Sequence, residues 1–319
     1  MDGETVLHIE DLCKRYPNGK LAVDSLSLSI SRGEVFGILG PNGSGKTTTI
    51  LMLLGLTEPS SGRVSILGLD PLRSPLGIKK RVGYMPDTVG FYDEYSGYEN
   101  LDYTARFLDL SAGERTRRIE ESLAKMGLSE TMHQKVGTYS HGMRRRLGLA
   151  EVLVKQPEIA ILDEPTQGLD PESASEFLDL IAYLKTHERI TILLASHLLN
   201  QVQEVCDRVG LFSGGKMVVS GTVDELSSRI LGGRYKVTLR TEDTKSGDSV
   251  AERLSGIEGV HDVRESEPGE YHVECERDVR SALSRAVIET GGELCELTMH
   301  RHTLDSIYKT YFQEVRNAT

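Results

Sequence analysis

The amino-acid sequence predicts an α/β protein, with a large P-loop domain followed by a small α+β domain. A short apolar segment, residues 35–39, leads directly into a glycine-rich loop and then into a helical run. Two later segments, 159–164 and 191–197, have the near-continuous apolar character of strands buried on both faces of a parallel sheet. From residue 231 onward, strand and helix patterns alternate in a different order, so we expect a separate second domain.

The N-terminal region is expected to form an antiparallel β layer. Residues 5–32 alternate in apolar and polar character around a turn at Pro17-Asn18-Gly19. The strand 35–39 and a helix at 47–54 then enclose a loop that fits the pattern G-x-x-x-x-G-K-[ST]. Its residues are Gly40, Pro41, Asn42, Gly43, Ser44, Gly45, Lys46, Thr47 and Thr48. An ordinary glycine-rich turn is the alternative, but the complete pattern between a strand and a helix is typical of a phosphate-binding loop.

This loop has the chemistry that a nucleoside triphosphate requires. Glycine lets the backbone approach phosphate closely, and the N–H groups converge on an anion at the helix N-terminus. Lys46 would reach the β- and γ-phosphates, and Thr47 would ligate Mg²⁺. We therefore predict that all nine loop residues bind the nucleotide.

Two later strands end in residues that suit the same site. Asp163 and Glu164 close the strand 159–164, and His197 closes the strand 191–197. Ligands in open α/β sheets lie at the carboxyl ends of the strands. We expect Asp163 to hold Mg²⁺, Glu164 to act as general base on a water, and His197 to contact the γ-phosphate. Taken alone, the acids could serve solubility and the histidine could be an ordinary surface residue.

The rest of the chain is expected to follow a simple order. Residues 88–155 are mostly helical, and strands alternate with helices from 159 to 228, including a hairpin at 209–220 and a helix at 224–230. Leu231-Gly232-Gly233 marks the boundary between domains at 1–230 and 231–319. The tail has the order βαββαβ of a ferredoxin-like sandwich, followed by a helix at 303–315 with an apolar packing stripe. Its expected elements are 235–239, 250–254, 260–265, 270–275, 279–290 and 294–299.

Composition excludes several classes of protein. The net charge of −11 argues against general nucleic-acid binding, and residues 144–146 form the one basic run of note. No apolar stretch reaches the ~18–20 residues of a membrane helix, and the acidic N-terminus does not resemble a signal peptide. Four scattered cysteines fit a reducing cytoplasm. The tail holds histidines and cysteines without the spacing of a ligand quartet, so no metal site is expected among His272, Cys275, Cys295, His300 and His302.

Together these motifs resemble one family, the ATP-binding subunits of ABC transporters, over residues 5–225. The resemblance implies that Tyr16 stacks on adenine, that 40–48 and 159–164 are the Walker A and B motifs, and that Glu164 and His197 are catalytic. Gly168-Leu169-Asp170 resembles the D-loop. It also implies a helical subdomain at about 88–155, with ATP and Mg²⁺ as cofactors.

The signature segment of that family is expected at Tyr139-Ser140-His141-Gly142-Met143. The resemblance implies that Ser140 and Gly142 contact the γ-phosphate of ATP held by a second subunit, so that two chains form a head-to-tail homodimer. Ser140 as N-cap of a helix also suits an anion on physical grounds. His141 and Met143 replace the usual glycine and glutamine, a variation similar to that of the ABC-2 exporter subgroup.

The second departure from the family is Asp87, where glutamine is usual. The family's glutamine touches Mg²⁺ and the attacking water, and links the nucleotide to the membrane partner. An aspartate can also ligate Mg²⁺, although it is shorter and brings a negative charge toward the γ-phosphate. A tolerated substitution is the simpler interpretation. More narrowly, segments 81–87, 91–92 and 303–308 look like the Nos-type ATPases, which serve copper-site maturation of nitrous oxide reductase.

The resemblance implies an ATP-hydrolysing subunit of an ABC-2-type exporter on the cytoplasmic face of the cell membrane. A separate transmembrane permease would supply the transport path. Phe91, Tyr92 and Tyr95 would anchor that partner, or else pack within the helical subdomain. The alternative is a soluble ABC ATPase that acts on ribosomes or DNA; a regulator that does not hydrolyse ATP is disfavoured by Glu164 and His197.

Overall fold

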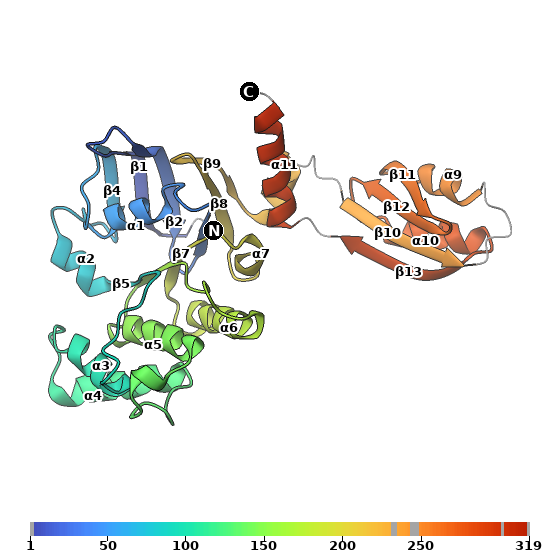
Figure 1. Ribbon diagram of the computed structural model, residues 1–319. Helices are drawn as coiled ribbons and strands as arrows, with labels where there is room; N and C mark the ends of the chain where they lie inside the picture. Colours follow the sequence, from blue (N-terminus) through green and yellow to red (C-terminus); the bar gives the residue numbers. More distant parts are fainter. Residues whose placement is uncertain (1–2, 231–234, 243–248, 301–302, 318–319) are drawn as a thin grey trace. The chain divides into compact units, whose positions relative to one another are not determined.

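The computed structural model describes residues 3–230, 235–242, 249–300 and 303–317. The chain divides into two compact units, one up to Ser220 and one from Gly221 onward (Figure 1). The boundary expected at Leu231-Gly232-Gly233 lies outside the described residues. Each unit has its own apolar core, and we describe them separately.

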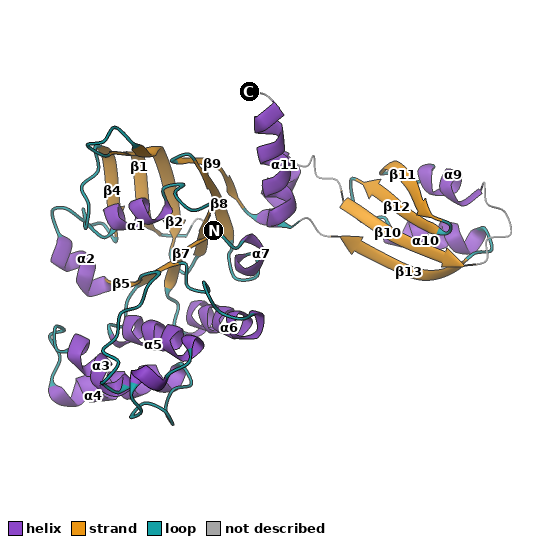
Figure 2. Ribbon diagram, viewed as in Figure 1, coloured by secondary structure: helices purple, strands orange, loops and turns teal. Residues whose placement is uncertain are grey.

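The first unit begins with the predicted antiparallel layer. β1 (Thr5–Arg15) and β2 (Leu21–Ser31) pair around the turn, and β4 (Ser61–Ile66) adds a third strand on the other side of β1 (Figure 2). Sequence reasoning missed β4, because its sequence Ser-Gly-Arg-Val-Ser-Ile is largely polar and only its last residue is fully buried.

A six-stranded sheet of order β5-β6-β7-β3-β8-β9 forms the centre of this unit. β3 pairs in parallel with β7 and β8, and β6 pairs in parallel with β5 and β7, which confirms the parallel core sheet. Every residue of β3, β6 and β7 is buried, as their continuous apolar sequences predicted. The strand bounds are β3 (Val35–Leu39), β5 (Val82–Met85), β6 (Ile159–Asp163), β7 (Thr191–Ser196), β8 (Arg208–Ser213) and β9 (Lys216–Gly221).

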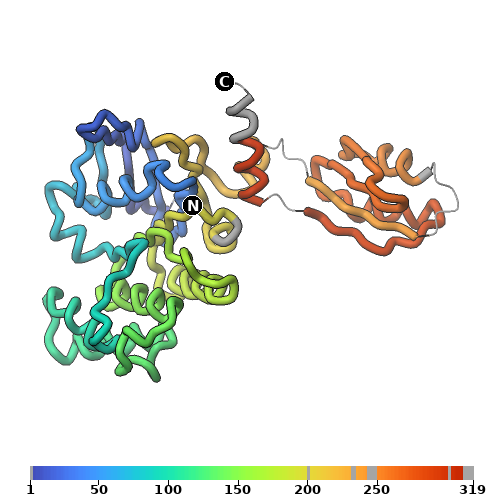
Figure 3. Tube along the Cα trace, viewed as in Figure 1, coloured from blue at the N-terminus to red at the C-terminus, as the bar shows by residue number. Residues whose placement is uncertain are grey.

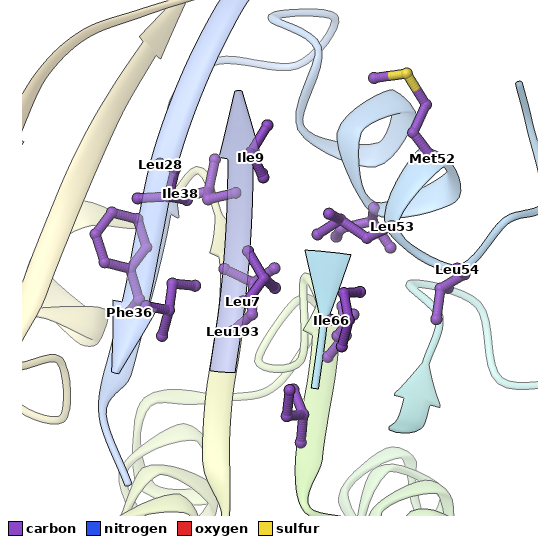
Figure 4. Close-up of a cluster of buried hydrophobic side chains, with 14 of the residues drawn as sticks. Leu7, Ile9, Leu28, Phe36, Ile38, Met52, Leu53, Leu54, Ile66 and Leu193 are labelled. Carbon is purple, nitrogen blue, oxygen red and sulfur yellow. The ribbon is translucent and has the colours of Figure 1, made fainter. Parts of the chain in front are cut away.

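The antiparallel layer packs against this sheet and the first helix through one large apolar cluster. Figure 4 shows Leu7 and Ile9 of β1 beside Leu53 of α1 (Lys46–Leu53), with Ile38 and Leu193 from the central sheet. Each of these side chains is at most 1% exposed. Since α1 follows the glycine-rich loop directly, this packing fixes the loop to the sheet.

Three helices, α3, α4 and α5, pack against one another in the region predicted to be helical (Figure 1). Serines cap all three: Ser96 forms a capping box with Glu99, and Ser111 and Ser140 each accept a bond from a backbone N–H of the first turn. The helix bounds are α2 (Pro75–Arg81), α3 (Gly97–Ala105), α4 (Ala112–Lys125), α5 (His141–Val154), α6 (Pro171–His187) and α7 (Leu199–Val202).

The second unit has the predicted ferredoxin-like order. Its sheet runs β11-β12-β10-β13 with antiparallel neighbours, and α9 and α10 fall in the two crossover positions (Figure 3). Val237, Leu239, Tyr271 and Val273 point from the sheet into an apolar core. The elements are α8 (Val223–Ile230), β10 (Tyr235–Glu242), α9 (Ser249–Ser255), β11 (Val260–Glu267), β12 (Glu270–Cys275), α10 (Arg280–Glu289), β13 (Glu293–His300) and α11 (Leu304–Asn317).

The apolar stripe predicted for the last helix is a packing face. Leu304 and Ile307 of α11 are fully buried, and α11 packs against α8. In the tail, His272 is exposed and Cys275 is buried, as expected for opposite faces of one strand. No arrangement of three metal-ligating side chains is found among the described residues, and His302 lies outside them. None of the described helices is both long and apolar enough to cross a membrane.

Candidate functional site

The glycine-rich loop lies between β3 and α1, against two neighbouring strands. A Cβ atom at Gly40 would lie 2.3 Å from the carbonyl oxygen of Phe212, and one at Gly45 would lie 2.4 Å from that of Ala22. Gly45 also has φ +116°, which L side chains rarely adopt. Only glycine therefore fits at these two positions of the motif.

Lys46 is the first residue of α1 and points back into the loop. Its Nζ donates a hydrogen bond of 2.7 Å to the carbonyl oxygen of Gly40 and lies 3.3 Å from Oε1 of Glu164. Only 5% of the lysine side chain is exposed. The buried ammonium thus connects the loop to the end of β6, where an incoming phosphate would meet both.

The end of β6 meets α1 through a second contact. Thr47 Oγ1 donates a hydrogen bond of 2.9 Å to Oδ2 of Asp163, and the other carboxylate oxygen of Asp163 has no partner. Burial raises the pKa of Asp163, against the bond from Thr47 that lowers it. A hydroxyl and a buried carboxylate side by side are the oxygen ligands that Mg²⁺ takes in proteins.

Glu164 and His197 come together because their strands are parallel neighbours. The backbone N–H of Glu164 donates to the Ala195 carbonyl, and Nδ1 of His197 lies 2.8 Å from Oε2 of Glu164. The backbone N–H of His197 also donates to that oxygen, at 3.2 Å. Glu164 has φ +48°, a conformation that costs free energy and is concentrated at functional sites.

Lys46, Thr47 and Glu164 line a pocket of about 240 Å³, and Gly40, Asp163 and His197 are not part of its lining. Its lining consists of Tyr16, Lys20, Ala22, Asn42, Gly43, Gly45, Lys46, Thr47, Thr48, Asp87, Glu164 and Gln167. Glu164 in this lining has a buried carboxylate oxygen without a hydrogen-bond partner, and so do two residues next to lining residues in the sequence, Ser44 in its hydroxyl and Asp163 in its carboxylate. Such atoms are rare in folded proteins and call for a ligand, and a polyphosphate with a divalent cation would satisfy both the donors and the carboxylates.

The two predicted signature residues lie apart from this pocket. Ser140 is exposed at the N-terminus of α5, where its hydroxyl accepts a hydrogen bond from the backbone N–H of Met143. Gly142 lies near Ser173 of α6. Within one chain, the described residues therefore bring Tyr16, Asp87 and the loop together around the pocket and leave Ser140 and Gly142 outside it.

Sequence reasoning missed two residues at the edge of the site. Gln167 lines the pocket, and its carbonyl oxygen accepts a bond from the guanidinium of Arg145. Arg145 lies in the basic run at 144–146 and is almost completely buried. In the sequence, nothing distinguishes Arg145 from its two arginine neighbours. Only the packing of α5 in the structure shows that Arg145 is buried.

Comparisons with known proteins agree with this geometry. The family model described as "ABC transporter" matches residues 23–167. The chain is 33% identical to the bacitracin transport ATP-binding protein BcrA of Bacillus licheniformis, over 95% of this chain and 96% of that protein. It is 34% identical to the daunorubicin resistance ATP-binding protein DrrA3 of Streptomyces coeruleorubidus, over 96% and 95% respectively. The linearmycin resistance ATP-binding protein LnrL of Bacillus subtilis is 33% identical over 95% and 93%.

A solved structure supports the fold. CbiO1 of Clostridium perfringens, described as part of the ABC transporter complex CbiONQ, superimposes with a TM-score of 0.64 at 28% identity. The match covers 72% of this chain and 97% of CbiO1, so it spans about the length of the first unit.

Proposed function

This chain belongs to the ATP-binding proteins of ABC transporters, which are ATPases, and we propose that it powers an ABC-2-type exporter through a separate membrane permease. The proteins named for bacitracin transport and for daunorubicin and linearmycin resistance align over nearly the whole chain, and they favour export. A Nos-type role in copper-site maturation is the narrower alternative, supported by the short segments 81–87 and 303–308.

The chain's own residues supply the steps of ATP hydrolysis. Lys46 and the loop N–H groups bind the β- and γ-phosphates, and Tyr16 stacks on the base. Glu164, held by His197 and by its strained backbone, accepts a proton from the attacking water. Thr47, Asp163 and Asp87 would hold Mg²⁺, which neutralises phosphate charge when bound.

A second copy of the chain completes the proposed site. Ser140 and Gly142 lie at the exposed N-terminus of α5, where the positive end of the helix dipole suits an anion. We propose that they reach the γ-phosphate bound by a second subunit, as the family resemblance implies. ATP would then close a head-to-tail homodimer, and hydrolysis would open it. The permease would place this dimer at the cytoplasmic face of the membrane.

A groove in the first unit supports the proposal that the chain binds a membrane partner. It has a volume of about 570 Å³ and a predominantly apolar lining. The lining comes from α2, from β5 and the loop after it, from the end of α3 and the residues that follow it, and from α5. Leu76, Tyr84, Thr104, Phe107 and Val152 are among its residues. An exposed apolar groove of this kind marks an interaction site.

Exposed aromatic side chains extend the groove. The Tyr92 ring lies 5.3 Å from the ring of Tyr95 and 5.4 Å from that of Tyr103, and the Phe107 ring lies 5.8 Å from that of Tyr103. Tyr92 is 54% exposed and Phe107 is 79% exposed. The rings thus pack on one another at the surface of the helical subdomain and keep much of their area open. We propose that a segment of the permease docks here, with these rings as anchors.

The docking proposal can be tested in cells with paired substitutions. Phe91 is only partly exposed, so Tyr92→Ala with Phe107→Ala is the better pair, because it removes contact area without opening the core. We expect the pair to move most of the chain from the membrane pellet to the supernatant, while ATP affinity stays within about threefold.

Tyr183→Ala, at an exposed aromatic on α6 of the same unit, is the matched control and should leave the chain on the membrane. Membrane association of the paired variant at the parent level would show that the partner binds elsewhere. If the control variant also loses membrane association, the assay reports non-specific association of exposed aromatic side chains with the membrane.

A further inference from the structure

The loop after β5 is held against α5 at a close approach. A Cβ atom at Gly148 of α5 would lie 3.1 Å from Cγ1 of Val89, and it would lie 3.5 Å from Met85 at the end of β5. The missing side chain at Gly148 therefore lets the loop lie directly on the helix. This contact brings Asp87, two residues before Val89, to the first turns of α5.

Arg145 occupies the place where this loop, α5 and the loop after β6 meet. Its Nη2 lies 3.7 Å from Oδ1 of Asp87 and donates a hydrogen bond of 3.2 Å to the carbonyl oxygen of Gln167. The side chain is only 6% exposed, whereas that of Asp87 is 46% exposed. Asp87 and Gln167 both line the nucleotide pocket. The guanidinium of Arg145, which is not part of that lining, therefore contacts two of the residues that form it.

Burying this guanidinium costs free energy that its visible contacts do not recover. Two of its nitrogens, Nε and Nη1, have no hydrogen-bond partner. Burial lowers the pKa of Arg145, while the carboxylates of Asp87 and Glu164 act in the opposite direction. A buried arginine that keeps unpaired donors next to a reactive site calls for an explanation beyond packing.

The charges of the pocket suggest that explanation. Glu164 and Asp87 line the pocket and Asp163 lies next to Glu164, and Lys46 forms an ion pair with Glu164 at 3.3 Å. An unpaired Asp87 would add a full negative charge next to a triphosphate, which is already strongly anionic. Arg145 is not part of the lining of the nucleotide pocket, so its nearly buried guanidinium approaches Asp87 from outside that pocket.

We infer that Arg145 is a positioning residue that neutralises Asp87 and fixes its carboxylate between the loops after β5 and β6, so that Asp87 can serve the metal site without repelling ATP. The inference rests on the proposed metal role of Asp87. It makes Asp87 and Arg145 a functional pair, in which the acid is tolerated only while the arginine compensates it.

A double-mutant cycle tests the pair in the full-length chain. The variants are Arg145→Gln, Asp87→Gln and the combination. The readouts are the Kd for ATP with and without Mg²⁺, and KM for MgATP and kcat at several Mg²⁺ concentrations. We expect Arg145→Gln to raise KM on the order of tenfold, with a smaller change in kcat, because Asp87 then repels the nucleotide. The same change made in Asp87→Gln should raise KM by less than about twofold, so the two effects are strongly non-additive.

Arg144→Gln is the matched control, since Arg144 is the preceding residue on α5 and pairs with Asp93. It should leave KM within about twofold of the parent. Arg145→Lys keeps the charge without the planar fork, and should give an intermediate KM. This second variant, with thermal melting of each protein, keeps the test decisive if Arg145→Gln folds poorly.

Additive effects in folded variants would overturn the pairing, even in a chain that hydrolyses ATP normally. If Asp87→Gln has the same KM and kcat as the parent at every Mg²⁺ concentration, Asp87 does not hold the metal, and the proposed metal role on which the pair rests is wrong. If Arg144→Gln and Arg145→Gln raise KM equally, the cause is the loss of any positive charge on α5 and not the pairing of Arg145 with Asp87, and the inference is overturned.

Discussion

The two units of the chain differ sharply in what they bury. In the first unit, Lys46, Arg145, Asp163 and Glu164 are each at most 6% exposed, at the carboxyl ends of the parallel strands and on the helices beside them. In the described part of the second unit, no charged side chain is buried, and the buried polar side chains of Ser227 and Thr241 are neutral hydroxyls. Its charged residues lie outside an apolar core.

This difference shows that the first unit, and not the second, contains buried charged groups that lower its stability and can serve chemistry. Buried charges and unpaired polar atoms destabilise a fold unless a ligand satisfies them. The first unit combines them with a backbone strain at Glu164 and with loop positions that only glycine fits. The second unit has an antiparallel sheet over an apolar core, and none of its described non-glycine residues has a positive φ. Changes in the first unit should therefore affect catalysis, and changes in the second should affect stability alone.

The largest expected effect comes from changing a glutamate to glutamine in the first unit, compared with the same change in the second unit. Glu164→Gln removes the general base but keeps the shape of the side chain, so hydrolysis should fall by roughly 10²–10⁴-fold. ATP should still bind, and the ATP-bound dimer should accumulate on size-exclusion chromatography with ATP present.

Glu258→Gln in the second unit is the control for this change. Glu258 is 90% exposed and pairs with Arg277, so its substitution should leave the rate within about twofold of the parent. Full activity in Glu164→Gln would contradict the proposed base, and a monomer with ATP would contradict the dimer.

A second prediction compares the two cores directly. Leu239 on β10 and Ile161 on β6 are both fully buried, so either residue changed to alanine should cost about 2–5 kcal/mol of unfolding free energy. Ile161 lies two residues before Asp163 on the same strand, so Ile161→Ala should also weaken ATP binding, by about tenfold. Leu239→Ala should leave ATP affinity within about threefold.

Calorimetry and titration with a fluorescent ATP analogue measure the two quantities on the same samples. Arg240→Ala, at an exposed position next to Leu239, should change neither. If Leu239→Ala weakens ATP binding as much as Ile161→Ala does, the second unit contributes to the nucleotide site and the contrast between the units is wrong.

The contrast also explains what could be predicted from the sequence. The parallel strands were visible because continuous burial produces continuous apolar sequence, and the loop was visible because close approach demands glycine at Gly40 and Gly45. The tail was visible because its strands and helices alternate clearly in apolar pattern. In each case a local physical requirement left a local signal.

Features that depend on distant contacts left no such signal. β4 is largely polar because much of its surface stays partly exposed, and its pairing with β1 is decided by tertiary structure. Arg145 has two arginine neighbours that lie closer to the surface, and it is distinguished only by the loop that covers it. The sequence predicted that Glu164 and His197 serve the same site, but the hydrogen bond between them appears only in the structure, where both end neighbouring parallel strands.

The smallest expected effect concerns the sign of a pH dependence. Burial raises the pKa of Asp163 above its ordinary value of 3.8, so the folded chain binds this proton more tightly than the unfolded chain does. The ionised carboxylate therefore destabilises the nucleotide-free fold at neutral pH. As the pH falls through the raised pKa, that penalty is relieved, and it is absent below 3.8.

Asp163→Asn should consequently raise the melting temperature of the nucleotide-free chain at pH 7, by roughly one to three degrees, while it abolishes Mg²⁺-dependent hydrolysis. The gain should shrink as the pH is lowered.

The pKa of Asp278 in the second unit is shifted in the opposite direction, because hydrogen bonds from Arg280 lower it to about 2. Asp278→Asn should lower the melting temperature slightly at pH 7, by less than about a degree because the pair is exposed, and this loss should fade between pH 4 and pH 2. Melting curves of both variants between pH 2 and pH 8 measure the two slopes, and slopes of the same sign would show that burial at Asp163 is not what separates the two units.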